Sequence, residues 1–163
     1  MKNRMVTIVL ALLVLGLLAS ANALAYETET VLPSDLGVWF SDFFQISEDE
    51  VEPGENSAYV YQNGNDNSSE QVQEGQDNRA YIYQNGDGNI ANQWQSGVGN
   101  WAGAYQVGNY NTVVTQQLGT SNWAGAYQMG NANTARIQQS GDNFTALIAQ
   151  IGNNNSAVII QGK

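Results

Sequence analysis

The chain has 163 residues, with 15 Asp and Glu against five Lys and Arg, and it contains neither Cys nor His. The absence of both residue types excludes Cys/His zinc sites, thiol nucleophiles and Ser-His-Asp triads. Carboxylates are the side chains that remain for acid/base catalysis, and an exported form would have to hold together without disulfides.

The N-terminus is typical of a secretory signal peptide. Lys2 and Arg4 precede an apolar run at 5–18, and small residues follow, with Ala23 and Ala25 as an A-x-A cleavage pair. An uncleaved membrane anchor is the alternative, but the run is shorter than the ~18–20 residues that a span needs. Cleavage after Ala25 leaves three bases and 15 acids, a net charge of 3 − 15 = −12, so we expect neither nucleic acid nor an anionic membrane as a partner.

An internal repeat follows, and its unit is Q-x-G-x-x-N-x-A-x-x-x. Gln recurs at every eleventh position, Gly lies two positions after the first nine of these Gln, Asn lies five after, and a small residue, mostly Ala, lies seven after. The Gln positions are Gln62, Gln73, Gln84, Gln95, Gln106, Gln117, Gln128, Gln139, Gln150 and Gln161. The Asn positions are Asn56, Asn67, Asn78, Asn89, Asn100, Asn111, Asn122, Asn133 and Asn155.

A longer period lies over the first and predicts the fold. Tyr61, Tyr83, Tyr105 and Tyr127 recur with twice that spacing, so two repeat units form one coil, and coils start at 51, 73, 95, 117 and 139. Within a unit, Asn, Ala, a variable residue and the next Gln alternate with period two, as on one face of a strand, and the Gly segment forms a turn. We therefore predict an all-β protein, a β-solenoid of five 22-residue strand-turn-strand-turn coils in two stacked parallel sheets.

The fixed phase of Gln and Asn predicts ladders of side-chain amides. A buried amide is unfavourable unless its donors and acceptors are paired, and stacked coils place the same amide one strand above and below. We therefore predict that the Gln and Asn positions given above form a self-assembly ladder. The alternative is a disordered Gln/Asn-rich tract, but disorder does not require Gln at one phase in ten consecutive units.

Two further features leave alternatives open. Outward positions of one sheet are aromatic (Tyr59, Tyr61, Tyr81, Tyr83, Trp101, Tyr105, Trp123, Tyr127), and these rings either bind surfaces or sugars or, as we favour, stack within the sheet. Residues 26–50 are acidic with an apolar cluster, and either dock on the first coil or form a flexible leader. The chain thus divides into a signal peptide (1–25), an acidic, aromatic segment (26–50) and a repeat domain (51–163).

The repeat, which fills five 22-residue coils behind a Sec-type signal, resembles the curlins, the amyloid subunits of bacterial curli fibres. The resemblance covers residues 51–163 and implies a β-solenoid that polymerises on the outer cell surface and serves adhesion and the biofilm matrix. It also implies three kinds of partner: copies of the chain itself, a second curlin subunit, and the outer-membrane secretion and assembly machinery.

Departures from the family pattern shape the finer expectations. The Gly-rich mature N-terminus of the major subunit is absent, which together with Ala-Val-Ile-Ile-Gln at 157–161 resembles the minor, nucleating subunit. Phe144 replaces a repeat Asn, so we expect a kink in that coil. Pro53 cannot donate a ladder hydrogen bond, so the sequence leaves open whether the first coil (51–72) is regular.

Other functions fit the pattern less well. An enzyme needs a carboxylate cluster and a calcium-binding solenoid needs Asp at every turn, but the repeat acids are few and sporadic. Regular Thr ridges of an ice-binding solenoid are missing. We expect no catalysis, no cofactor or metal, and no small-molecule substrate. A non-polymerising β-solenoid surface adhesin is the alternative function; it would need capped ends, whereas Gln161 keeps the last strand in repeat phase.

Overall fold

The computed structural model describes residues 6–12 and 52–162, and every regular element among them is a β-strand. The strands form a six-stranded sheet in the order β1-β10-β8-β6-β4-β2 and a five-stranded sheet in the order β11-β9-β7-β5-β3. Their bounds are β1 Val6–Leu12, β2 Ser57–Asn63, β3 Ser68–Gln76, β4 Arg79–Asn85, β5 Ile90–Val98, β6 Trp101–Val107, β7 Thr112–Thr120, β8 Trp123–Met129, β9 Thr134–Ser140, β10 Thr145–Ile151 and β11 Ser156–Gly162. The all-β prediction and the two parallel sheets are confirmed.

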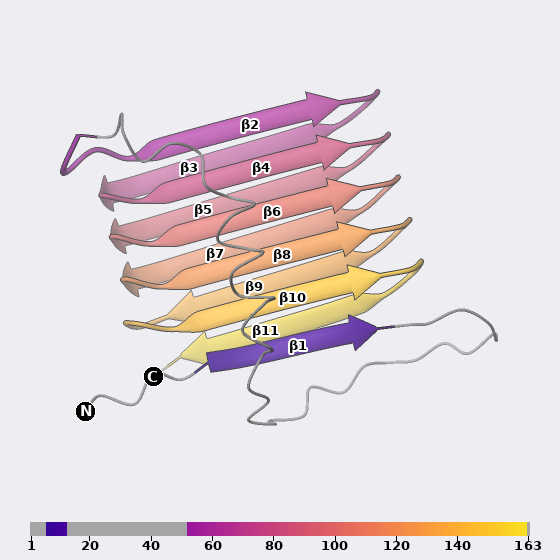
Figure 1. The fold of residues 1–163 in the computed structure, drawn as a ribbon. Helices are drawn as coiled ribbons and strands as arrows, with labels where there is room; N and C mark the ends of the chain where they lie inside the picture. The colour runs from indigo at the N-terminus through magenta and orange to yellow at the C-terminus, as the bar shows by residue number, and fades with distance from the viewer. Residues whose placement is uncertain (1–5, 13–51, 163) are drawn as a thin grey trace.

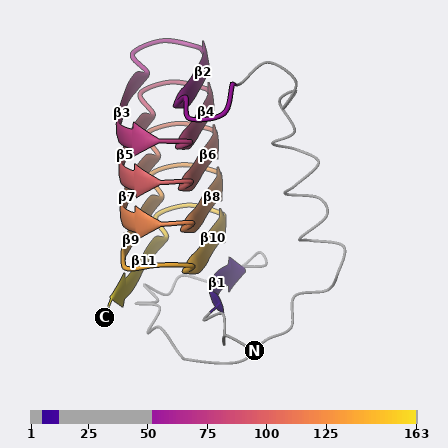
Figure 2. The same cartoon turned by 90° about the vertical axis from the view of Figure 1, so that its left-hand side faces the viewer.

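Each coil contributes one strand to each sheet. The chain runs along one sheet, turns, and returns along the other, so that β2 to β11 form five stacked coils, with β2 at the top and β11 near the bottom of Figure 1. Figure 2 shows the same coils as two layers joined by turns at both edges. All pairs between neighbouring coils are parallel, and each residue lies beside its equivalent in the next coil, such as Gln106 beside Gln128 and Ala102 beside Ala124. The 22-residue period is therefore the register of the sheets.

The core between the sheets is thin and built from the period-two face. Exposure alternates along β11, where Ala157, Ile159 and Gln161 are buried and the intervening residues are exposed. The apolar core cluster consists mainly of Ala with a few larger aliphatic residues, among them Ile82, Ile137 and Ile148. Small side chains allow the two sheets to approach, and the Gln and Asn side chains fill the remaining space.

The turns depend on positive φ at two repeat positions. Gly119 has φ +122, and a Cβ at this position would lie 2.0 Å from the carbonyl oxygen of Gly141 in the next coil, so no other residue fits. Two residues later the chain enters the left-handed region again, and there Ser121 (φ 56) and Ala132 (φ 54) serve as well as Gly99 (φ +67). Only the first of the two positions demands glycine.

The structure decides the regularity of the first coil and contradicts two expectations, a kink at Phe144 and the exposure of every outward aromatic ring. The first coil is regular, since β2 and β3 pair with β4 and β5 in full register. Pro53 lies before β2, so its missing N–H removes no hydrogen bond from the ladder. The coil of Phe144 is not kinked either, since its amide N–H donates to Asn122 Oδ1 (3.0 Å) and its carbonyl accepts from Trp123 N–H (2.8 Å). Tyr81 and Tyr127 face outward but are 7% and 9% exposed; Tyr81 contacts the Trp101 ring, and Tyr127 packs with Leu147 and Ala149 as well as with the Tyr105 ring.

Of the predicted signal peptide (1–25) and the acidic segment (26–50), the structure describes only residues 6–12. Residues 6–12, within the predicted signal peptide, form β1, which pairs with β10 in parallel and extends the larger sheet by one strand (Figure 1). The cleavage pair Ala23 and Ala25 and the whole of 26–50 lie outside the described residues. Within the part of the chain that the structure describes, no helix has the length and apolarity to cross a membrane.

Candidate functional site

Two columns of Gln side chains run through the core, one along each sheet. In the β1–β10 sheet, each Nε2 donates to the Oε1 of the next coil: Gln62 to Gln84 (2.7 Å), Gln84 to Gln106 (2.9 Å), Gln106 to Gln128 (3.0 Å) and Gln128 to Gln150 (2.8 Å). In the other sheet, Gln73, Gln95, Gln117, Gln139 and Gln161 form the same chain at 2.8–2.9 Å. All donors point toward the last coil.

The Gln side chains also tie the two sheets together. The Nε2 of Gln106 donates to the backbone carbonyl of Ile90 (3.0 Å), and that of Gln128 donates to the carbonyl of Thr112 (3.0 Å). These carbonyls belong to the opposite sheet, 16 residues earlier in the chain. Each inner Gln thus uses both amide hydrogens and its oxygen, which explains how a fully buried amide is tolerated. This bond across the core is not predicted by the repeat spacing.

The Asn side chains form two further columns, at the ends of the strands, with the opposite direction. Both the backbone N–H and the Nδ2 of Asn122 donate to the Oδ1 of Asn100, in the preceding coil (3.0 and 3.1 Å). The same Nδ2 donates to the carbonyl of Gly141 in the following turn (2.7 Å). One column runs through Asn56, Asn78, Asn100 and Asn122 and ends at Phe144, and the other runs without interruption through Asn67, Asn89, Asn111, Asn133 and Asn155.

A further column, outside the predicted ladder, is formed by turn residues. The backbone N–H of Asn65 donates to Asp87 Oδ1 (2.8 Å), that of Asp87 to Asn109 Oδ1 (2.8 Å), and so on through Asn131 and Asn153. These residues lie three positions after every second Gln, and the recurrence of Asn or Asp at that phase was the available signal.

This combination of period, amide columns and turns agrees with a comparison of the sequence with protein families. The family model for the curlin associated repeat matches residues 111–141 and 130–162. The chain therefore carries the curlin associated repeat. Comparison with curated protein sequences gives no match. The curlin repeat and the β-solenoid are structural features, and they support a curli-type structural subunit rather than an enzyme.

The curlin repeats also align aromatic rings on the outer face of the larger sheet. Tyr61, Tyr83, Tyr105 and Tyr127 stack at centroid distances of 4.9, 4.7 and 5.2 Å, with interplanar angles of 12° or less. Because the ring faces contact one another, the stacking interpretation is confirmed. Burial, and then the neighbouring Tyr83 and Tyr127, raise the pKa of Tyr105, and burial raises the pKa of Tyr127.

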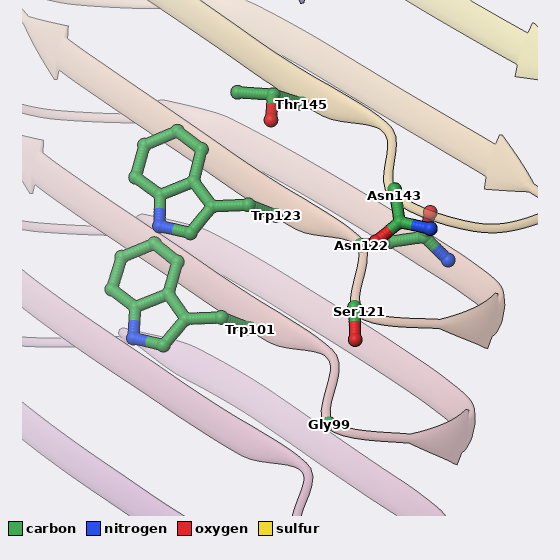
Figure 3. A pocket seen from close by; sticks show the side chains of 7 residues that line it. All are labelled: Gly99, Trp101, Ser121, Asn122, Trp123, Asn143 and Thr145. Carbon is green, nitrogen blue, oxygen red and sulfur yellow. The ribbon is translucent and has the colours of Figure 1, made fainter. Parts of the chain in front are cut away.

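A shorter aromatic column lies near the turns. The indoles of Trp101 and Trp123 stack at 4.8 Å and 2°, and Thr145 takes their register position in the next coil (Figure 3). A groove lies between these indoles and the turn residues Ser121 and Asn143. Among residues 6–12 and 52–162, no group of three or more His, Cys, Asp or Glu side chains could hold a metal ion.

The two ends of the solenoid carry complementary hydrogen-bonding groups because each column has a direction. At the first coil, the Oε1 atoms of Gln62 and Gln73 accept no hydrogen bond from the described residues, whereas their Nε2 atoms donate into the second coil. At the last coil, Gln150 Nε2 donates only to the carbonyl of Thr134 among the described residues, and Asn155 Oδ1 accepts nothing there. The predicted ladder residues are thus brought together within one chain, and their role in assembly stays a prediction.

Proposed function

We propose that this curlin-repeat protein is a subunit of an extracellular amyloid-like fibre, in which copies stack head to tail. The direction of the amide columns is the observation that carries the proposal. The last coil offers the Gln150 Nε2 donor and the Asn155 Oδ1 acceptor, and the first coil offers the Gln62 Oε1 acceptor and the Asn67 N–H donors, in the same register as between coils of one chain. Stacking two first coils would instead set oxygen against oxygen.

The open strand edges at the two ends support this stacking. Both sheets are parallel throughout, so β2 and β3 of an incoming copy could follow β10 and β11 as another coil, with backbone pairing as well as side-chain pairing. In the full chain β1 lies along β10, and we propose that β10 becomes free when residues 1–25 are removed as a signal peptide.

The match to the curlin associated repeat supports the remaining parts of the proposal. These are location outside the cell, on the bacterial surface, and a contribution to cell adhesion and the biofilm matrix. They also include partners of three kinds, namely copies of the chain, a second curlin subunit and the outer-membrane assembly machinery. The nucleating role of a minor subunit, and the division into domains at residues 25 and 50, belong to this proposal too.

Fibre diffraction on the secreted protein tests the function. We expect unbranched fibres that form without metal or cofactor, with a meridional reflection at about 4.8 Å, the spacing of strands along the axis. A protein that stays monomeric for days at micromolar concentration would contradict the proposal and would favour the alternative of a non-polymerising adhesin.

A further inference from the structure

One inward column changes its chemistry from one end of the solenoid to the other. The variable inward position of the five-stranded sheet holds, in coil order, Gln71, Gln93, Thr115, Ile137 and Ile159, which are in register with one another. The equivalent position of the other sheet is aliphatic in every coil, from Val60 to Ile148. The first coil therefore ends this column with an amide, and the last coil ends it with an isoleucine.

The amide at the first coil is only partly satisfied within the chain. Gln71 Nε2 donates to Gln93 Oε1 (3.0 Å) and to the carbonyl of Tyr59 (3.3 Å), while its Oε1 accepts no hydrogen bond from the described residues. At the other end, Ile159 is 3% exposed and packs in register with Ile137 as part of the apolar core cluster. An aliphatic side chain is therefore the natural neighbour for Ile159.

Head-to-tail stacking of two copies would place these two ends against each other. If the register between coils continues across the contact, Gln71 of the incoming copy lies on Ile159, as Gln93 lies on Gln71 within the chain. The Oε1 of Gln71 would then be buried against a side chain that has no donor. Asn56 meets a second mismatch, because its column ends at Phe144, which is 5% exposed and offers no side-chain acceptor. The contact between copies thus continues the Gln150 and Asn155 columns and leaves two polar residues, Gln71 and Asn56, without a matching partner.

We propose that the last coil prefers, over its own first coil, the first coil of a second curlin-repeat chain that carries an aliphatic side chain where this chain has Gln71. This inference rests on the proposed head-to-tail function and names the chemistry of the partner. The Gln150 and Asn155 columns align such a coil, and Ile159 selects it, because an aliphatic residue packs on isoleucine whereas a glutamine loses a hydrogen bond.

A cycle of substitutions tests the contact directly. Gln71→Ile pairs Ile with Ile across the contact between copies, Ile159→Gln pairs Gln with Gln, and the double variant restores a mismatch. Within one chain the two positions are four coils apart, roughly 19 Å at the usual strand spacing, so coupling between them reports on the contact between copies. Each substitution also disturbs a contact within the chain, because Gln71→Ile removes the donor to Gln93 Oε1 and Ile159→Gln sets an amide on Ile137, and these effects recur in the double variant and cancel in the cycle. We expect the double variant to leave at least about fivefold more soluble protein at the end of assembly than the two single-variant effects predict when they are combined.

The measurement uses protein secreted by cells that express the full chain, assembled in enough urea to leave measurable soluble protein. Ile160→Gln is the matched control, because it makes the same change on the same strand at a 69% exposed outward position, and its effect should combine additively with that of Gln71→Ile.

The possible outcomes distinguish a failure of the selective contact from a failure of the proposed fibre function. Fibres from all variants with equal soluble concentrations, or single-variant effects that simply add in the double variant, would overturn the selective contact and leave the fibre function standing. A wild-type protein that forms no fibres would overturn the proposed function, and the contact with it.

Discussion

At the scale of single residues, the position of a glutamine within the repeat decides whether it is buried and hydrogen-bonded or lies on the outer face. Gln138 and Gln139 are neighbours in β9, but Gln139 is 1% exposed and bonded to Gln117, Gln161 and the carbonyl of Trp123, whereas Gln138 lies on the outer face. Successive side chains of a strand point to opposite faces, so identical residues one position apart occupy unrelated environments.

Alanine substitutions at the two phases should separate position from composition. Gln128→Ala removes a partner from Gln106, from Gln150 and from the carbonyl of Thr112, and each unsatisfied buried group costs about 1–3 kcal/mol. We expect Gln128→Ala and Gln139→Ala to slow fibre formation, and Gln116→Ala and Gln138→Ala to change stability by no more than ~0.5 kcal/mol. Thioflavin kinetics on the four variants decides the matter, and equal slowing by all four would mean that Gln content alone drives assembly.

Thr115 is the residue at which we expect substitution to stabilise the solenoid. Its side chain is 1% exposed, and its Oγ1 is the one buried side-chain polar atom without a partner in the described part of the chain. Thr115→Val removes the hydroxyl with little change in shape, so we expect the free energy of unfolding to rise by about 1 kcal/mol. Urea unfolding measures it, with the half-buried Thr112→Val as control. A loss of stability in Thr115→Val would contradict the assignment of an unpaired hydroxyl.

At the scale of elements, the turns set how closely the coils stack. Backbone bonds continue through them, as from Gly108 N–H to the carbonyl of Asn85 (2.9 Å), and the Asn or Asp column follows the same path. Because every coil repeats the turn, a bulky residue at its tightest point separates two coils rather than disturbing one loop.

The two positive-φ positions of the turn should respond differently to alanine. In Gly119→Ala the new Cβ would lie 2.0 Å from the carbonyl oxygen of Gly141, so the neighbouring coil must move, and we expect a loss of more than about 3 kcal/mol. Gly99→Ala meets only Ser121 Oγ at 3.7 Å, and Ala132 already occupies the same phase at φ 54, so about 1 kcal/mol should be lost. Thermal unfolding of both variants tests this, and equal losses would contradict the role given to the interlocking backbone.

The tyrosine column should make stability fall in alkali. The pKa of Tyr105 is raised, so the folded chain holds this proton more tightly than the unfolded chain does. Stability is then unchanged below the ordinary tyrosine pKa of about 10 and declines as the pH rises through the raised value. Urea unfolding between pH 8 and 12 should show a smaller decline in Tyr105→Phe. A wild-type stability that is flat or rising above pH 10 would be inconsistent with this column.

At the scale of the whole molecule, the ends of the solenoid decide whether coils of different chains can join. β1 covers the β10 edge of the larger sheet, and residues 6–12 belong to the predicted signal peptide. We expect N-terminal sequencing of the secreted protein to begin at Tyr26, and a chain that lacks residues 1–25 to stay inside the cell. Secreted protein that starts before Met5 would exclude the cleaved signal.

Much of this architecture is determined by the sequence alone. In a solenoid each residue stacks on its own equivalent one period away, so the regular recurrence of Tyr83, Tyr105 and Tyr127 is also the register of the sheet. Alternation then decides which side chains are buried, as Ala80, Ile82 and Gln84 demonstrate.

What only the tertiary structure decided depends on side-chain rotation and on the offset between the two sheets. Spacing along the chain does not encode that offset, so the bond from Gln106 to the carbonyl of Ile90 could not be predicted. The rotation of the side-chain amides makes the Gln columns donate toward the last coil and the Asn columns toward the first. These directions give the two ends of the solenoid different donors and acceptors. The same rotation also allows the coil of Phe144 to stay regular, because the backbone N–H alone continues the bond to Asn122 that an asparagine would have made with two groups.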